Sequence, residues 1–121
     1  MNGTTTLIVD DNEGMRLLAR TLVVENGGTV VAEAADGEAA VECALAHEPQ
    51  LVLMDHRMPR ADGVEATRRI KAAQPEATVV AWTTLDDPAA ARSFFDAGAE
   101  EFIVKHDIAT LERVLRRYCA A

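Results

Sequence analysis

The stretch Leu51–Glu65, "LVLMDHRMPRADGVE", places an aspartate directly after an uninterrupted apolar run. A short apolar run followed by turn-forming residues, here Pro59 and Gly63, is typical of a buried strand. Asp55 would then lie at the carboxyl end of that strand, where the chain leaves the sheet. We therefore expect a rigidly held carboxylate at the rim of a sheet, a position that points to chemistry rather than to packing.

Four more runs of β-branched and apolar residues resemble this strand and recur at intervals of about two dozen residues, the length of a strand, a helix and their turns. The predicted strands are Thr4–Val9, Thr29–Ala34, Leu51–Met54, Thr78–Thr83 and Glu101–Val104. Helical periodicity fills the gaps between them. The predicted helices cover Met15–Val23, Gly37–Ala46, Val64–Ala73, Pro88–Ala97 and Ile108–Tyr118.

Capping residues support two of these helices. Asp62, followed three positions later by Glu65, predicts a capping box at the start of the third helix. Asp87 before Pro88 is an N-cap followed by proline at the first helical position. Gly98 falls where the fourth helix should end. We therefore interpret Asp62 as a helix cap and not as a ligand.

Strict alternation of strand and helix predicts an α/β fold with a parallel sheet, right-handed crossovers and helices on both faces. With 121 residues the chain suits a single domain spanning residues 1–121, and we expect no output domain in it. The carboxyl ends of parallel strands share one edge, where such sheets bind ligands. That edge should collect Asp10, Asp11, Asp55, Thr83 and Lys105.

Composition narrows the classes of function. The formal net charge of −8 argues against a nucleic-acid binder, because phosphate backbones require an excess of lysine and arginine. No apolar stretch is long enough to span a bilayer, and we see no signal peptide. Cys43 and Cys119 lack metal-ligand spacing, so we interpret both as reduced packing residues. We therefore expect a cytoplasmic protein without membrane or direct nucleic-acid partners.

Three carboxylates at one edge need a physical reason. Ionised pairs repel by about 4 kcal/mol at ~4 Å and an effective dielectric of ~20, so Asp10, Asp11 and Asp55 require a cation or raised pKa values. An all-oxygen ligand set favours Mg²⁺, or Mn²⁺, over zinc. Lys105 and the hydroxyl of Thr83 would complete a pocket for a phosphoryl group. A carboxylate can accept such a group as an acyl phosphate.

These residues resemble the receiver domains of two-component response regulators. The similar motifs are "LIVDD" (Leu7–Asp11), "LVLMDHRMPRADG" (Leu51–Gly63), "VVAWT" (Val79–Thr83) and "GAEEFIVK" (Gly98–Lys105). The resemblance, with these motifs in the same order, covers essentially the whole chain. The resemblance implies a three-layer, doubly wound (βα)5 flavodoxin-like fold with strand order 2-1-3-4-5. It also places Cys43 and Cys119 on helices that cover opposite faces of the sheet, so the two should not pair.

The resemblance further implies the metal site and the acceptor. Asp55 is the expected phosphoacceptor and one metal ligand. Asp11 should bind Mg²⁺ directly, Asp10 through water, and Arg57 through its backbone carbonyl.

The same resemblance implies how the phosphoryl group is sensed. Lys105 should pair with the phosphoryl oxygens. Thr83 should act as a switch hydroxyl that turns toward them, and Phe102 as an aromatic switch that rotates inward as Thr83 moves. The switch would act on the fourth-helix and fifth-strand surface.

Some positions depart from the family pattern. Receivers commonly have a cis proline after the lysine, whereas Lys105 precedes His106 here, and we expect a trans bond because a non-proline cis bond costs about 2.5–4 kcal/mol. Thr84 is bulkier than the usual small residue and should narrow access to Asp55. Arg57 and Leu85 flank the phosphoryl position, and we expect both to slow its hydrolysis.

Simpler interpretations exist for several residues. Asp10-Asp11 could be a polar turn before a helix capped by Asn12. His56 should point away from Asp55, because strand neighbours face opposite sides. The basic clusters at Arg68–Lys71 and Glu112–Tyr118 should be solvated helix faces. Histidines 47 and 106 should be surface residues and Trp82 a packing residue, and one ring of the Phe94-Phe95 pair should enter the core.

Three functions are compatible with the sequence. The first is a Mg²⁺-dependent receiver that accepts a phosphoryl group on Asp55 from a histidine kinase or phosphotransfer protein. It would act on a downstream protein or a fused output domain as a signalling domain rather than a turnover enzyme. The second is a phosphorylation-independent interaction module with a receiver fold. The third is a phosphatase of the haloacid-dehalogenase-like type, which requires a second acid where this chain has Arg57. We favour them in that order.

Overall fold

The computed structural model describes residues 3–119 and contains five strands that alternate with five helices in that range. The strands are β1 (Thr5–Val9), β2 (Thr29–Ala34), β3 (Leu51–Met54), β4 (Thr78–Thr83) and β5 (Glu101–Val104). The helices are α1 (Glu13–Glu25), α2 (Gly37–His47), α3 (Gly63–Ala73), α4 (Pro88–Ala97) and α5 (Ile108–Cys119). Four strands match the predicted bounds, and β1 starts one residue later than expected.

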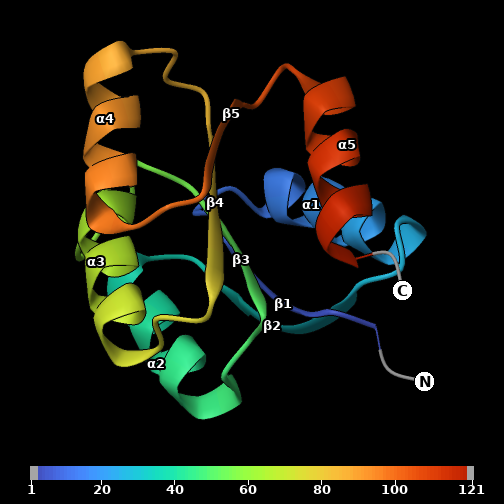
Figure 1. Ribbon diagram of the computed structural model, residues 1–121, viewed down its shortest axis with the longest axis horizontal. Helices are drawn as coiled ribbons and strands as arrows, with labels where there is room; N and C mark the ends of the chain where they lie inside the picture. The colour runs from blue at the N-terminus through green and yellow to red at the C-terminus, as the bar shows by residue number, and fades with distance from the viewer. Residues whose placement is uncertain (1–2, 120–121) are drawn as a thin grey trace.

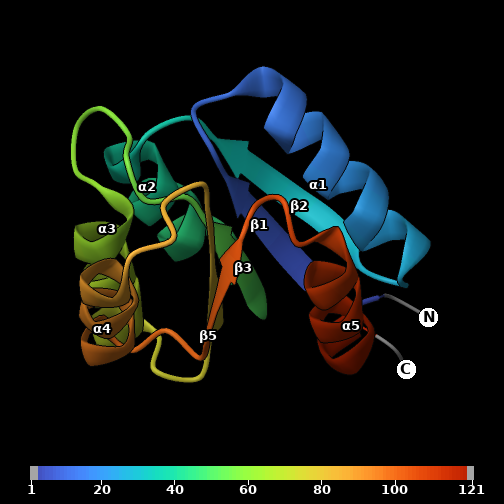
Figure 2. The same ribbon diagram turned by 90° about the horizontal axis from the view of Figure 1, so that it is seen from above.

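The strands form one parallel sheet in the order β2-β1-β3-β4-β5. Helices α1 and α5 cover one face, and α2, α3 and α4 cover the other (Figure 1; Figure 2, viewed from above). The predicted three-layer, doubly wound fold with strand order 2-1-3-4-5 is therefore confirmed. Because β1 and β3 are direct neighbours, the residues that follow them lie side by side.

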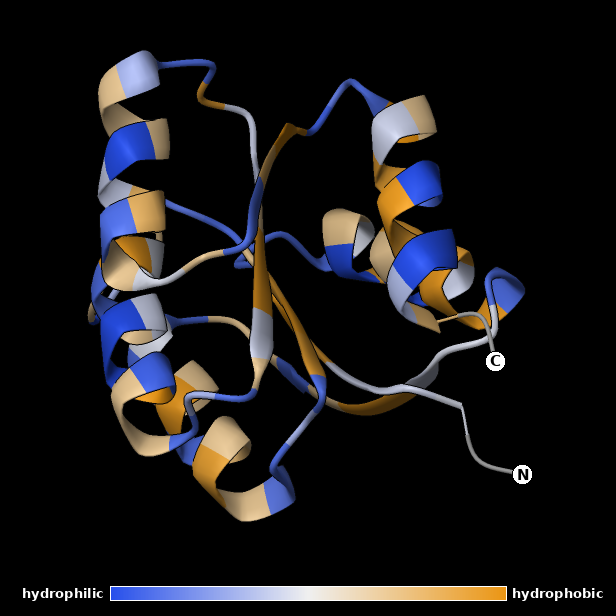
Figure 3. Cartoon of the chain, viewed as in Figure 1, coloured by the Kyte–Doolittle hydropathy of each residue, from blue (hydrophilic) through white to orange (hydrophobic). Residues whose placement is uncertain are grey.

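Burial on both faces explains why the central strands are continuously apolar. Every residue of β3 is buried, and only the first residue of β4 is partly exposed. One half of the core packs under α2–α4 and the other under α1 and α5. Figure 3 shows the same pattern, with hydrophobic residues concentrated in the central strands and on the inward faces of the helices.

Cap geometry confirms the helix starts, with one correction. Asp62 accepts a hydrogen bond from the Glu65 backbone N–H, at 3.0 Å between nitrogen and Oδ1. The side chain of Glu65 does not reach back to complete a capping box, because its carboxylate pairs with Arg68. Asp87 caps α4 ahead of Pro88 as expected. Gly98 ends α4 in the left-handed region, where glycine lacks the steric penalty of other residues.

Most packing predictions are also confirmed. Trp82 is buried, whereas in the Phe94-Phe95 pair only Phe94 enters the core and Phe95 is 49% exposed. Cys43 lies on α2 and Cys119 on α5, and they pack into the two different halves of the core. Both thiols are free. In residues 3–119 no helix has both the length and the apolar character needed to cross a bilayer.

Candidate functional site

The carboxyl ends of β1 and β3 bring two buried aspartates together. Val9 pairs with Met54 in the parallel ladder, and the chain continues into Asp10 on one strand and Asp55 on the other. The Asp55 backbone N–H donates to the Val9 carbonyl at 3.0 Å, which extends the pairing by one residue. The sheet itself therefore fixes the relative positions of Asp10 and Asp55.

Asp10, Asp11 and Asp55 form one acidic cluster. One carboxylate oxygen from each lies within 4.8 Å of the others. Asp10 and Asp55 are buried, at 1% and 7% exposure, while Asp11 is open to solvent. One oxygen of each buried carboxylate, Oδ1, accepts from a backbone N–H, that of Asn12 for Asp10 at 2.9 Å and that of His56 for Asp55 at 2.8 Å. These bonds fix the orientation of both buried carboxylates.

The loop that follows Asp55 is packed tightly against the end of its strand. The Gly63 N–H donates to the His56 carbonyl at 2.7 Å. A Cβ on Gly63 would collide with the backbone oxygen of Asp55, so only glycine allows this approach. Arg60 and Ala61 have positive φ angles of 59° and 96°, a conformation that costs free energy for residues with a side chain. This strained part of the loop lies against Gly37 at the start of α2.

Lys105 reaches this cluster from the end of β5. Its Nζ lies 2.5 Å from Asp10 Oδ2 and 3.5 Å from Asp55 Oδ2, and its side chain is 9% exposed. The peptide bond to His106 is trans, as predicted, and the Lys105 N–H donates to the Thr83 carbonyl at 2.7 Å. Nζ also lies 5.5 Å from the ring centroid of Trp82. The departure from the family pattern at residue 106 therefore leaves the lysine within reach of both buried carboxylates.

The surroundings of Asp55 disfavour its charge. Burial is the main cause, and the neighbouring Asp10 carboxylate adds to it, so the pKa of Asp55 rises to about 6. The Lys105 ammonium and the His56 N–H act in the opposite direction and lower this pKa. A single lysine thus compensates the buried carboxylates only in part.

The cluster fits a divalent cation such as Mg²⁺. It offers carboxylate oxygens from three aspartates within the span of one ion, and Asp10 Oδ2 is buried without an aligned hydrogen bond although Lys105 lies beside it as an ion pair. Histidine and cysteine ligands, which favour zinc, take no part in this cluster. Arg57 lines the same cavity, next to Asp55. The donor set is therefore that of a hard cation.

A cavity of about 470 Å³ opens above the acidic cluster. Thr83, Thr84, Leu85 and Arg57 line it together with Asp11, Asp55 and Lys105. The Thr83 hydroxyl accepts a hydrogen bond from the Leu85 N–H at 3.2 Å. Thr84 and Arg57 are exposed and Leu85 is half-buried, so these three side chains form the rim rather than the floor. The cavity has room for a phosphoryl-sized group beside Asp55.

Phe102 lies away from the cavity, in the layer beneath α4. It is half-buried, and its ring centroid is 5.9 Å from that of Phe94 on α4. The His56 ring meets Phe94 edge-on at 5.2 Å, so His56 faces away from Asp55 as predicted. Contacts thus run from the residue beside Asp55, through α4, to Phe102 on β5.

Two residues of α1 join the site although sequence reasoning did not assign them there. The Arg16 Nη1 donates to the Asp10 backbone carbonyl at 2.8 Å, and Met15 lines the cavity. Asn12 caps α1 by accepting from the Met15 N–H, so the simpler interpretation of this turn is correct for Asn12. The sequence could have indicated these two residues by their position, because the first turn of α1 starts at the same sheet edge as Asp11.

The remaining candidates lie outside the site. Histidines 47 and 106 are exposed, as expected. The basic side chains predicted to be solvated helix faces form surface ion pairs, Arg68 with Glu65 and Arg117 with Glu101. The prediction of a solvated face is wrong for Lys71, whose side chain is only 15% exposed and pairs with Glu100 at the opposite edge of the sheet.

Comparisons with known proteins agree with this geometry. A family model described as the response regulator receiver domain matches residues 6–116. The chemotaxis protein CheY of Bacillus subtilis is 40% identical over 99 residues, which cover 82% of each chain. A protein-glutamate methylesterase/protein-glutamine glutaminase of Natronomonas pharaonis is 40% identical over 105 residues, and this chain spans only 30% of that longer protein.

Solved structures give the same result at the level of the fold. The CheX-CheY-BeF3-Mg complex of Borrelia burgdorferi includes a chain with a TM-score of 0.87 and 28% identity, covering 95% of this chain and 89% of that one. The response regulator domain of Thermotoga maritima CheB has a TM-score of 0.86 and 26% identity, with 95% of each chain covered. The chain therefore shares its fold with these two solved structures.

Proposed function

This chain belongs to the response regulator receiver family of two-component signalling, and from that premise we propose that Asp55 is its phosphoacceptor. The observation that carries the proposal is the buried Asp55 carboxylate, aligned by the His56 N–H and lying 3.5 Å from the Lys105 ammonium at the floor of an open cavity. A fixed, desolvated carboxylate beside a cation is well placed to attack a phosphorus atom.

The proposed reaction transfers a phosphoryl group from a phosphohistidine on a sensor kinase or phosphotransfer protein. An Asp55 oxygen forms the new P–O bond as the P–N bond breaks, and the imidazole keeps that electron pair. Lys105 neutralises a phosphoryl oxygen, and its ammonium leaves Asp10 to do so. Water later attacks the acyl phosphate, the bond between phosphorus and Asp55 breaks, and inorganic phosphate leaves as the Asp55 carboxylate is restored. The chain would thus work as a signalling domain rather than as a turnover enzyme.

Four groups would hold the divalent cation. Asp11 and Asp55 would bind it through carboxylate oxygens, Asp10 through a water molecule, and Arg57 through its backbone carbonyl. Mg²⁺ suits this set, with Mn²⁺ as a possible substitute. The bound ion would supply positive charge that stabilises the transferring phosphoryl group. The CheY chain in the Borrelia burgdorferi structure was captured with beryllofluoride and magnesium, which supports this assignment.

Phosphorylation would alter the surface formed by α4 and β5. We propose that the Thr83 hydroxyl leaves the Leu85 N–H and turns toward a phosphoryl oxygen. Phe102 would then rotate toward the space released and change its contact with Phe94 on α4. The change would be read by a downstream protein partner or a fused output domain. Phe102 has no hydroxyl, so it would signal through packing alone.

Three rim residues should set the lifetime of the acyl phosphate. Leu85 and the long side chain of Arg57 would restrict the approach of water, and Thr84 would narrow the entrance. Leu85→Glu and Arg57→Asn should each accelerate loss of the phosphoryl group several-fold, measured as decay of radiolabelled protein. Unchanged decay in both variants would rule out this shielding role.

The first experiment measures Trp82 fluorescence during a beryllofluoride titration, with and without Mg²⁺. Trp82 is the only tryptophan in the sequence, and it precedes Thr83. We expect a saturable change that requires Mg²⁺ and is lost in Asp55→Asn. Asp86→Asn, which removes an exposed carboxylate outside the cluster, should retain it.

Calorimetry provides an independent readout of the same titration, because binding heat does not depend on the position of the indole. If neither fluorescence nor heat reveals Mg²⁺-dependent binding, the phosphoacceptor assignment fails and a phosphorylation-independent interaction module becomes the better description. The sequence features that favour that module are the Lys105-His106 junction and the bulk of Thr84. Against the first, the Lys105 Nζ lies within 3.5 Å of both buried carboxylates.

A further inference from the structure

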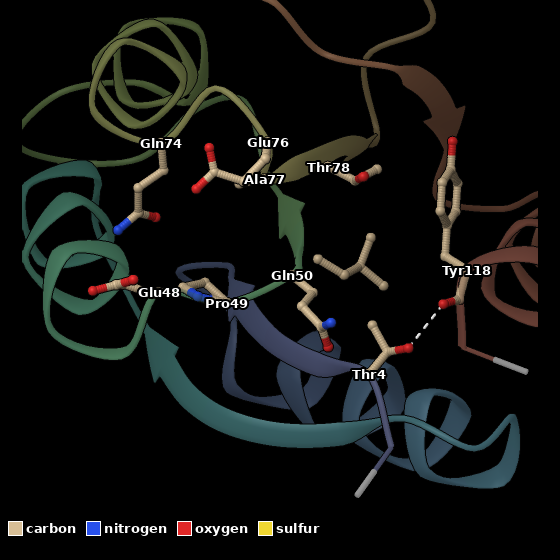
Figure 4. A pocket seen from close by; sticks show the side chains of 10 residues that line it. Thr4, Glu48, Pro49, Gln50, Gln74, Glu76, Ala77, Thr78 and Tyr118 are labelled. Atoms are coloured by element: carbon tan, nitrogen blue, oxygen red, sulfur yellow. Dashed lines mark hydrogen bonds between the residues drawn. The ribbon is translucent and has the colours of Figure 1, made fainter. Parts of the chain in front are cut away.

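A second pocket lies at the opposite edge of the sheet, where the strands begin. Its volume is about 350 Å³, and the ends of α2, α3 and α5 surround it. Leu51 and Tyr118 contribute apolar surface, and Glu48, Gln74 and Glu76 contribute acceptors. Figure 4 shows these three polar side chains gathered at one end of the pocket and Tyr118 at the other. None of the residues of the acidic cluster takes part in it.

Gln74, at the wall of this pocket, carries an enclosed acceptor without a hydrogen-bond partner among residues 3–119. The residue is 9% exposed, and its Nε2 donates to the Ala44 carbonyl at 2.8 Å. That bond fixes the orientation of the amide, because a flipped amide would set two oxygens against each other. The Oε1 atom is buried and accepts no hydrogen bond from residues 3–119. It lies on the side of the amide that faces the pocket (Figure 4). A buried acceptor of this kind calls for a donor.

The charge around the pocket is negative and uncompensated. Between residues 3 and 119, neither Glu48 nor Glu76 forms an ion pair or a side-chain hydrogen bond. The nearby Lys71 is already engaged, since its Nζ donates to the Ala77 carbonyl at 2.6 Å and to Glu100 at 2.9 Å. Two carboxylates therefore border the pocket, and no lysine or arginine lines it.

We propose that this pocket binds a small organic cation with N–H donors, of the guanidinium or alkylammonium class. An N–H would satisfy the Gln74 oxygen, and the positive charge would offset Glu48 and Glu76. Leu51 and the Tyr118 side chain, toward the other end of the pocket, would contact the alkyl chain of the ligand. The volume far exceeds that of one water molecule, and the partly apolar wall suits an organic cation better than a bare metal ion.

The test is a two-dimensional ¹⁵N–¹H NMR titration with butylguanidinium, in saturating Mg²⁺ so that the acidic cluster is occupied. Butylurea has a similar shape without the charge and serves as the matched ligand. We expect saturable shifts of the Glu48, Gln74 and Ala77 amides with butylguanidinium and none with butylurea. Shifts of equal size with both compounds, or shifts centred on Asp55, would overturn the proposal, as would no shift at all.

Variants then separate the pocket from general surface charge. The double substitution Glu48→Gln and Glu76→Gln should weaken binding about tenfold. Glu42→Gln, which removes an exposed charge from α2 outside the pocket, should leave the affinity unchanged. Gln74→Met removes the acceptor while keeping an unbranched side chain, and it should also weaken binding. Equal effects of Glu42→Gln and the double substitution would contradict the assignment. Neither result bears on phosphorylation of Asp55.

Discussion

The two edges of the sheet differ in how far their buried charges are compensated by neighbouring groups. At the carboxyl edge, Asp10 and Asp55 face each other with one lysine between them, and the pKa of Asp55 rises to about 6. At the amino edge, Lys71 donates to two backbone carbonyls and to Glu100, and the other oxygen of Glu100 accepts from the Val79 N–H. The carboxyl edge leaves its buried carboxylates only partly compensated, whereas the amino edge uses the largely buried Lys71 ammonium to join three segments.

The largest effect on stability should come from the amino edge. Lys71→Met keeps the aliphatic stem but removes the ammonium that binds Pro75, Ala77 and Glu100. We expect the free energy of unfolding to fall by about 3 kcal/mol, since the partly buried Ala77 carbonyl and two more exposed acceptors lose a charged donor. Urea denaturation monitored by circular dichroism measures this change.

Arg68→Met provides the matched control for that experiment. Arg68 also pairs with a glutamate, but its side chain is 58% exposed. Its loss should change the free energy of unfolding by less than about 0.5 kcal/mol. If the two variants lose similar stability, the amino edge has no special structural role and the contrast between the edges is wrong.

The second effect, of opposite sign, should come from the carboxyl edge. Asp55→Asn removes a charge that burial and Asp10 disfavour, so the metal-free protein should become more stable by about 2–3 kcal/mol at pH 8. The wild-type penalty is fully present above pH 6, where Asp55 is ionised in the folded state, and part of it remains between pH 3.8 and 6, where folding must take up a proton. It therefore decreases as the pH falls through about 6, and it vanishes below the ordinary value of 3.8.

The stability difference between Asp55→Asn and the wild type should accordingly fall below about 1 kcal/mol at pH 4. Denaturant titrations in EDTA at both pH values test this. Saturating Mg²⁺ should narrow the difference at pH 8, because an ion that binds the folded wild type stabilises it. A variant that is no more stable than the wild type at pH 8 would show that Lys105 already balances the carboxylates fully.

The contrast between the edges also explains what the sequence alone could predict. Runs of β-branched and apolar residues located β2–β5 to the residue. The signal is clearest in β3 and β4, which are continuously apolar or β-branched because they are buried on both faces. The convergence of Asp10, Asp55 and Lys105 followed from strand ends that share one edge. Adjacency of β1 and β3 required the family resemblance, since periodicity contains no information about strand order.

Sequence patterns could not predict which partner several side chains would contact. Glu65 has the spacing of a capping box, yet it pairs with Arg68 on the same helix. Both side chains are solvent-exposed, so neither is held in one conformation by packing. The bond from Arg16 to the Asp10 carbonyl depends on the path of the turn between β1 and α1. Gln74 reaches α2 only because α3 packs beside it. The Arg16 and Gln74 bonds depend on tertiary geometry, whereas Glu65 has two local partners that sequence spacing alone does not distinguish.

The smallest predicted effect concerns how Arg16 supports the carboxyl edge. Its Nη1 holds the Asp10 backbone carbonyl at 2.8 Å, and its Nε lies 3.5 Å from Glu33. Arg16→Met should weaken Mg²⁺ binding about threefold to tenfold, because groups that orient metal ligands typically act on this scale. Arg20→Met is the matched control, since Arg20 pairs with the same glutamate and has no bond to Asp10. Calorimetric titration with Mg²⁺ measures both affinities. Equal losses would assign the effect to the charge of Glu33 rather than to the position of Asp10, and the carboxyl edge would then be organised by its backbone alone.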